Sequence, residues 1–144
     1  MDTSLNSINS EAVQSHLGIT QSIIQRMATN SASSKAWCIT IVSAILVIIA
    51  EKGKPKYAYI AIIPTILFLI LDAYYLALEK AFRHSYNDFI DKLHNGTVVG
   101  KDLYVISPKG NLFLTFLKAI CSFSVWPFYI TLIVVIWLFK SIIF

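Results

Sequence analysis

The chain has 144 residues, of which 56% are hydrophobic and 14% are charged, and its formal net charge is +4. Soluble domains carry roughly 25% charged residues, so this composition is typical of a protein that lies in a lipid bilayer. The length leaves no room for a separate soluble catalytic domain. A basic balance is common in membrane proteins because Lys and Arg collect on the cytoplasmic side.

Residues 1–35 are predicted to lie outside the membrane as a polar tail and an amphipathic helix. The start is rich in Ser and Asn, and Ser10–Asn30 then brings apolar residues such as Leu17 and Ile24 near one helix face. The small polar residues of Ser31–Lys35 predict a hinge before the first apolar block.

Residues 36–77 are predicted to form a transmembrane hairpin. The apolar blocks Ala36–Ala50 and Tyr57–Ala77 flank the lysine-rich turn Glu51–Lys56. A helix needs roughly 20 apolar residues to cross the bilayer core, and flanking lysines can snorkel to extend the shorter first block. The first block also carries a ridge of small residues, which lets helices approach closely in lipid. The members of this small-residue ridge are Ala36, Thr40, Ser43 and Ala44.

The helix that begins near Tyr57 is predicted to continue to His94, beyond the membrane. Its second half keeps an apolar stripe at helical spacing, and Asn95-Gly96 is a typical helix end. The stripe comprises Leu78, Phe82, Tyr86, Phe89 and Leu93. Such a stripe needs a partner in water, most simply the same helix of another subunit. Pro64, inside the span, predicts a kink.

The rest of the chain divides into a cytoplasmic segment that completes 78–111 and a final apolar segment, 112–144. Thr97–Ile106 places two β-prone runs around Gly100-Lys101-Asp102, which predicts a short cytoplasmic β-hairpin. Leu112–Ser124 is expected to be a lead-in helix and Val125–Phe144 a third span, with one kinked helix as the alternative. The predicted fold is an all-α membrane protein with three transmembrane helices, the second extended into a cytoplasmic helix.

The distribution of Lys and Arg predicts the orientation of the hairpin. Eight of these residues lie on one side of the first two spans, and three lie in the turn Glu51–Lys56 on the other side. Because positive charges are enriched on the cytoplasmic side, the N-terminus is expected in the cytoplasm.

An acidic residue, Asp72, lies inside the second apolar block. A carboxylate in a membrane span is costly and usually faces a partner or water. If the two blocks fold back on each other around Glu51–Lys56, Lys35 falls opposite Asp72 and stabilises its charge. One interpretation is that this pair only fixes the register of the hairpin. The other is that Asp72, with Tyr74 and Tyr75, lines a polar vestibule or gate in an oligomer.

Residues for catalysis or metal binding are not grouped along the sequence. The three His and two Cys residues show no spacing typical of a zinc site or a catalytic triad, so we expect no enzyme, cofactor or metal site. Basic residues on the cytoplasmic side are candidates for binding an anionic ligand, because Lys and Arg pair with phosphates. These candidates are Lys80, Arg83, Lys92 and Lys101.

Two stretches resemble a known group of proteins. One stretch, at the start of the first predicted span, contains Asn30-Ser31 and Lys35-Ala36-Trp37. The other, at the end of the second predicted span, contains Leu71-Asp72-Ala73-Tyr74-Tyr75-Leu76, followed by Glu79 and Phe82-Arg83. Over residues 30–83 this pattern resembles small bacterial multi-pass effectors of anti-phage defence, including the Hailong type. In such systems a nucleotidyltransferase makes a nucleotide product that controls a membrane protein.

The resemblance implies a homo-oligomeric effector, a tetramer or larger, in the bacterial inner membrane. It would depolarise or permeabilise that membrane during infection. A nucleotide or oligonucleotide ligand and a nucleotidyltransferase encoded nearby are implied as partners, besides the lipid bilayer. The resemblance also implies a shared core with structural or gating roles, formed by Lys35, Trp37, Asp72, Tyr74 and Tyr75. We therefore expect an oligomeric channel or pore, and the alternative is a non-conducting anchor or adaptor that recruits a cytoplasmic partner.

Overall fold

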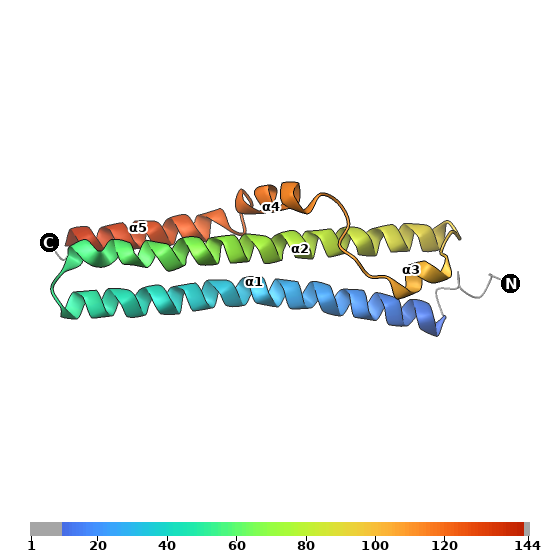
Figure 1. Ribbon diagram of the computed structural model, residues 1–144, viewed down its shortest axis with the longest axis horizontal. Coiled ribbons are helices and arrows are strands. Elements are labelled where there is room, and N and C mark those ends of the chain that lie inside the picture. Colours follow the sequence, from blue (N-terminus) through green and yellow to red (C-terminus); the bar gives the residue numbers. More distant parts are fainter. Residues whose placement is uncertain (1–9, 143–144) are drawn as a thin grey trace.

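The computed structural model describes residues 10–142, and all regular elements in that range are helices (Figure 1). The two long helices are α1, Glu11–Glu51, and α2, Ile62–His94, and they run antiparallel. The other elements are the 3-10 helix η1, Pro55–Ala61, and the helices α3, Gly100–Tyr104, α4, Leu112–Ile120, and α5, Trp126–Ile142. Figure 1 shows α1 along one side of α2 and the pair α4 and α5 along the other.

The helix α1 is continuous through the segment for which a hinge was predicted, so that prediction is wrong. Ser10 caps the helix, and its Oγ accepts from the amide of Val13 at 3.3 Å. Within Ser31–Lys35, the hydroxyl of Ser34 donates to the carbonyl of Asn30 at 2.8 Å, so this polar side chain has a hydrogen-bond partner within the helix itself. Packing of α1 along α2 outweighs the modest helix propensity of Ser, which amounts to only a few tenths of a kcal/mol per residue.

The connection between α1 and α2 is a tight turn followed by η1. Gly53 has φ +59°, in the left-handed region that suits glycine. Pro64 occupies the third position of α2, where a backbone N–H would have no α-helical acceptor. A kink was predicted at Pro64; in the structure the chain instead changes from 3-10 helix to α-helix just before this residue. The predicted helical rod to His94 is confirmed, with its first part wound as η1.

The segment predicted as a β-hairpin forms the short helix α3 instead, and residues 10–142 contain no strand. The carboxylate of Asp102 accepts from the amide of Val99 at 3.2 Å and caps the start of α3. Leu103 then enters a small core with Val13 and Phe89. An isolated hairpin is marginal in water, whereas the helical turn buries a side chain against α1 and α2.

The same small core covers the last two residues of the apolar stripe of α2, Phe89 and Leu93, from within the chain. Phe89 and Leu93 are buried against Val13 of α1 and Leu103 of α3, with Leu17 packed beside them. The partner of the stripe was predicted to be another subunit; for Phe89 and Leu93, α1 and α3 of the same chain provide it. Leu78, Phe82 and Tyr86 of the stripe are half-buried.

The final apolar segment forms two separate helices, as predicted, rather than one kinked helix. Asn111 caps α4 through its side-chain oxygen, which accepts from the amide of Leu114 at 3.1 Å. The chain then turns and restarts at Trp126. At the far end of α5, the ammonium of Lys140 donates to the hydroxyl of Tyr59 at 2.6 Å and fixes α5 to η1.

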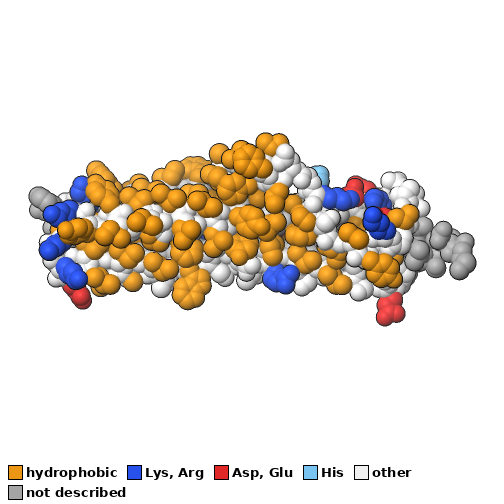
Figure 2. Space-filling model, in the orientation of Figure 1, with side chains coloured by type: hydrophobic (Ala, Val, Ile, Leu, Met, Phe, Trp, Pro, Cys, Tyr) orange, Lys and Arg blue, Asp and Glu red, His pale blue; other side chains and the backbone are white. Residues whose placement is uncertain are grey.

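Two helical segments, Glu11–Glu51 and Pro55–His94, contain stretches long and apolar enough to cross a membrane. The helix α5 has 17 residues and falls short of the roughly 20 that a straight span needs. Exposed apolar side chains cover the molecule from the η1 end to α4. We call this region the apolar band. On the face drawn in Figure 2, charged side chains gather at the two ends of the rod and at one point on α1. A third span is not shown.

Candidate functional site

The carboxylate of Asp72 is fully buried where α2 faces α1. Its Oδ1 accepts a short hydrogen bond, 2.5 Å, from the hydroxyl of Ser31. The Nζ atom of Lys35 lies 2.6 Å from Oδ2, as an ion-pair contact without hydrogen-bond alignment. The predicted pairing of Lys35 with Asp72 is thus confirmed.

The geometry of the pair follows from helix periodicity. Ser31 and Lys35 are one turn apart on α1, so both face α2, and Nζ of Lys35 lies 3.4 Å from Oγ of Ser31. The side chain of Lys35 is 22% exposed, so its ammonium closes the outer edge of the site. A buried carboxylate is tolerated only when charge and hydrogen bonds satisfy it, and here one α1 surface supplies both.

Around Asp72 the structure is closed by small and aromatic side chains. Cys38 of α1 and Tyr129 of α5 lie close enough to Asp72 for electrostatic interaction, and both are fully buried. The hydroxyl of Tyr129 donates to the carbonyl of Phe68 at 3.0 Å, one turn before Asp72. This bond attaches α5 to α2 at the level of the ion pair. The site is therefore a sealed, neutralised contact among three helices.

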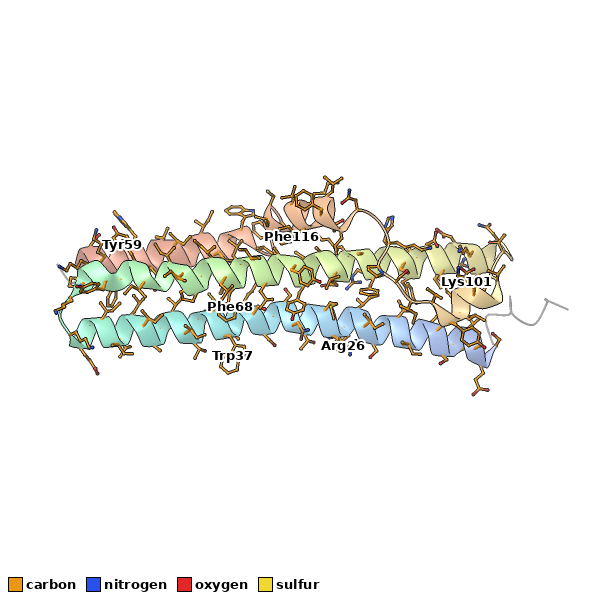
Figure 3. All side chains as sticks on the ribbon, in the orientation of Figure 1. Arg26, Trp37, Tyr59, Phe68, Lys101 and Phe116 are labelled. Atoms are coloured by element: carbon orange, nitrogen blue, oxygen red, sulfur yellow. The ribbon has the colours of Figure 1, made fainter. Side chains whose placement is uncertain are left out.

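The remaining residues of the predicted core do not join this contact. Trp37 is 62% exposed and points away from α2 (Figure 3). Tyr74 lines an apolar groove of about 700 Å³ between α2 and α4, together with residues such as Phe116. The rings of Tyr74 and the half-buried Tyr75 lie 6.0 Å apart. The structure thus brings together Lys35 and Asp72, but it distributes the three aromatic residues over other surfaces.

The four basic candidates for an anionic ligand are likewise separated. Arg83 lies in a polar cleft between α1 and α2, and its Nε donates to Glu79 at 2.9 Å. Lys92 and Lys101 line a second cavity, where Lys92 pairs with Asp102 at 2.9 Å. Lys80 lines a third cavity beside α4. No single cavity gathers all four.

The cavity of Lys92 is part of a charged strap that ties the segment after α2 back onto that helix. The strap consists of two ion pairs, Lys92 with Asp102 and Lys109 with Asp88. The hydrogen bond from Lys109 lowers the pKa of Asp88, and that from Lys92 lowers the pKa of Asp102. In return, the bond to Asp102 raises the pKa of Lys92. Nearby, Nδ1 of His16 lies 3.1 Å from the carbonyl oxygen of Leu103.

Sequence reasoning missed two residues of the site. Ser31 was assigned to a hinge, although its place one turn before Lys35 puts it on the same face once α1 is continuous. Tyr129 lies in the last apolar segment, and no pattern indicated that its hydroxyl meets the carbonyl of Phe68. Among residues 10–142 no cluster of His, Cys, Asp or Glu could hold a metal ion.

The chain was compared with protein-family models, with curated proteins and with solved structures, and nothing matches it.

Proposed function

We propose that the protein is a homo-oligomeric channel or pore of the bacterial cell membrane, with its N-terminus in the cytoplasm. The apolar band supports a location in lipid, because large apolar side chains such as Ile63, Leu67 and Trp137 are exposed there. A band of this kind is stable only where lipid or other protein covers it. The single described ion pair inside it, Lys35 with Asp72, is neutralised within the hairpin.

The back face of α1 supports self-association. The four residues of the small-residue ridge are all exposed on the side of α1 away from α2. The exposed faces of η1, α2 and α5 in the same band carry mainly large apolar side chains, whereas on α1 the small residues alternate with exposed ones such as Trp37 and Val47. In lipid, small residues allow close helix contact, so the ridge fits a second α1 better than it fits acyl chains. This run of exposed small residues on α1 is the observation that carries the proposal.

The ridge also offers a polar surface for an ion path. Thr40 and Ser43 lie on it, and Ser33 is exposed one turn before Trp37. The hydroxyl of Thr40 donates to the carbonyl of Ala36 at 3.0 Å, which leaves its oxygen able to accept from water. Copies of α1 arranged around an axis would present rings of such hydroxyls. In this arrangement Lys35 and Asp72 fix the register of each hairpin rather than line the path.

A role in anti-phage defence is part of the proposal and rests on the resemblance of residues 30–83 to membrane effectors of such systems. Permeabilising the membrane of an infected cell is the activity that an oligomeric channel would supply. Control by a nucleotide or oligonucleotide, made by a nucleotidyltransferase encoded nearby, stays a prediction, because the basic candidates lie in separate cavities.

The test is ion flux through proteoliposomes, combined with a membrane-potential dye in phage-challenged cells that express the protein. We expect dye release or potassium flux with the native chain and depolarisation of cells on infection. A folded protein that gives no flux, leaves the potential intact throughout infection and co-purifies with a second protein would instead support the anchor or adaptor alternative.

A further inference from the structure

Several charged side chains at the cytoplasmic end of the apolar band are paired within the chain, but four cations are not. Lys35, Arg83, Lys92 and Lys109 each contact a carboxylate. Among the described residues at this end, Arg26 of α1, Lys80 of α2, Lys101 of α3 and Lys118 of α4 contact none, and all four are exposed. Of these four, Lys80 and Lys118 are the two that α2 and α4 carry.

Lys80 lines a small cavity, and Lys118 lies one helical turn from Thr115 of its lining. A pocket of about 240 Å³ between α2 and the start of α4 is lined by Lys80, His84, Lys109 and Thr115, with Ala81 and Gly110 completing it. Lys118 follows Thr115 by one helical turn, so the two residues share a face of α4. Figure 2 shows basic and histidine side chains bordering the hydrophobic surface at this end of α4.

The position of the pocket corresponds to the boundary of a bilayer. From Ile62 to Lys80, α2 rises about 27 Å, which is close to the roughly 30 Å thickness of a hydrocarbon core. The amide of Lys109 donates to the carbonyl of Ala81 at 3.2 Å, so α4 begins at this level and runs back into the apolar band. The backbone of Lys118 lies deeper in the apolar band than this boundary, but its long aliphatic side chain can extend back so that the ammonium reaches the boundary.

The helix α4 has the chemistry of an interfacial helix. Its outward face exposes Phe113 (68%), Leu114 and Leu117, and Phe123 follows in the turn after it (82%). Such a helix lies among the upper acyl chains, where the nearest anions are lipid phosphates. A cation among apolar residues is costly unless an anion reaches it, and α4 supplies no carboxylate for Lys118.

We propose that this pocket binds the headgroup phosphate of an anionic phospholipid, with Lys80 and Lys118 as its principal cations. Thr115 and His84 line the same pocket and are placed to add hydrogen bonds. Basic pockets between helices at the membrane boundary are the usual sites of anionic lipid recognition. The lipid adds a polar contact between α2 and α4, which already pack on one core through Ala77 and Ala119 and through larger residues such as Phe116.

The test uses purified full-length protein in detergent, with phosphatidylglycerol or phosphatidylcholine added, and it needs no channel activity. Retained lipid is counted by native mass spectrometry, and thermal unfolding is followed by circular dichroism. Removing a lysine near an anionic surface weakens binding about fivefold, so the double variant Lys80→Gln/Lys118→Gln should lose roughly 25-fold in phosphatidylglycerol affinity. The matched control is Lys54→Gln/Lys56→Gln at the opposite end, which should bind like the native chain.

The charge-preserving variant Lys80→Arg/Lys118→Arg should retain the lipid, which separates loss of charge from loss of fold. Equal loss of phosphatidylglycerol in the two Gln variants, or equal stabilisation by phosphatidylcholine, would overturn the proposal. Stabilisation by inorganic phosphate at the same concentration, with no added effect of phosphatidylglycerol, would also overturn it in favour of a soluble anion.

Discussion

The Nζ atom of Lys35 lies 2.6 Å from Oδ2 of Asp72, and this contact joins α1 to α2 at the point where the carboxylate is buried between them. The carboxylate is fully buried, and its other oxygen accepts from Ser31. Because one side-chain pair and one hydroxyl satisfy the acid, the two helices have a preferred register along their length. A slip of one helical turn would leave the charge unpaired among apolar side chains.

Removing one member of the pair should cost more than removing both. Lys35→Met leaves Asp72 buried and unpaired, and we expect a loss of about 3 kcal/mol in the free energy of unfolding. The double variant Lys35→Met/Asp72→Leu should lose markedly less, because neither charge remains buried. Unfolding in a detergent titration measures the double-mutant cycle. A double variant as unstable as the sum of the single variants would show that the two charges are not coupled.

Asp72→Asn should preserve both assembly and ion flux. The amide keeps an oxygen that can accept from Ser31, and the pair is sealed between helices rather than placed on the ridge. Flux through proteoliposomes and oligomer mass in detergent are measured on the same preparation. Loss of flux with an intact oligomer would show that the charge of Asp72 takes part in gating, contrary to its role as a register contact.

Two threonines allow a matched test of the small-residue ridge. Thr40 on α1 and Thr131 on α5 are both exposed, and each donates its hydroxyl to the carbonyl four residues earlier. Thr40→Leu should prevent close approach of neighbouring α1 helices and shift the protein to smaller species, whereas Thr131→Leu should not. Cross-linking in membranes and native mass spectrometry report the shift. Equal effects of the two substitutions would remove the ridge as the contact surface.

The hydroxyl of Tyr129 should contribute measurably to the attachment of α5. Tyr129→Phe removes the donor to the carbonyl of Phe68 while keeping the ring, and we expect a cost of about 1 kcal/mol. Tyr104→Phe is the control, because Tyr104 is 87% exposed. Thermal unfolding in detergent compares the two, and a Tyr129→Phe variant as stable as the control would contradict the assignment.

The charged strap should open in acid. The pKa values of Asp88 and Asp102 are lowered by their lysine partners, so their stabilising contribution is present above about pH 4 and is lost as the pH falls below that value. The raised pKa of Lys92 keeps its contribution through neutral pH and loses it only in strong base. Hydrogen exchange should show faster exchange in 97–109 near pH 3, after correction for the intrinsic rate. Protection that stays constant from pH 7 to pH 3 would contradict this.

The register of the hairpin could be predicted because it depends on few variables. The length of the turn and the antiparallel direction decide which residues face each other. Asp72 is the one acid among the apolar residues of its block, so a cation, Lys35, is expected directly opposite it. The continuity of α1 could not be read in the same way. Ser31–Lys35 has weak local helix propensity, and its helical state is favoured by contacts with α2, including the hydrogen bond to Asp72.

The segment after α2 shows a second limit of local patterns. Its Val, Leu and Ile residues favour a strand by propensity, but the ion pairs of Asp102 and Lys109 and the burial of Leu103 depend on residues distant in sequence. The separation of Lys80, Arg83 and Lys101 into different cavities has the same origin. Sequence shows that these residues are basic, whereas their distribution around α2 and α3 depends on packing.

The oligomeric state of the native chain in lipid nanodiscs tests the central claim most directly. Native mass spectrometry after release from nanodiscs counts the copies, and Thr40→Leu is measured beside the native chain. The proposed channel predicts a closed assembly of about four or more copies, because close packing of tilted helices around an axis is needed to enclose a path. A monomer at all protein-to-lipid ratios would contradict the account.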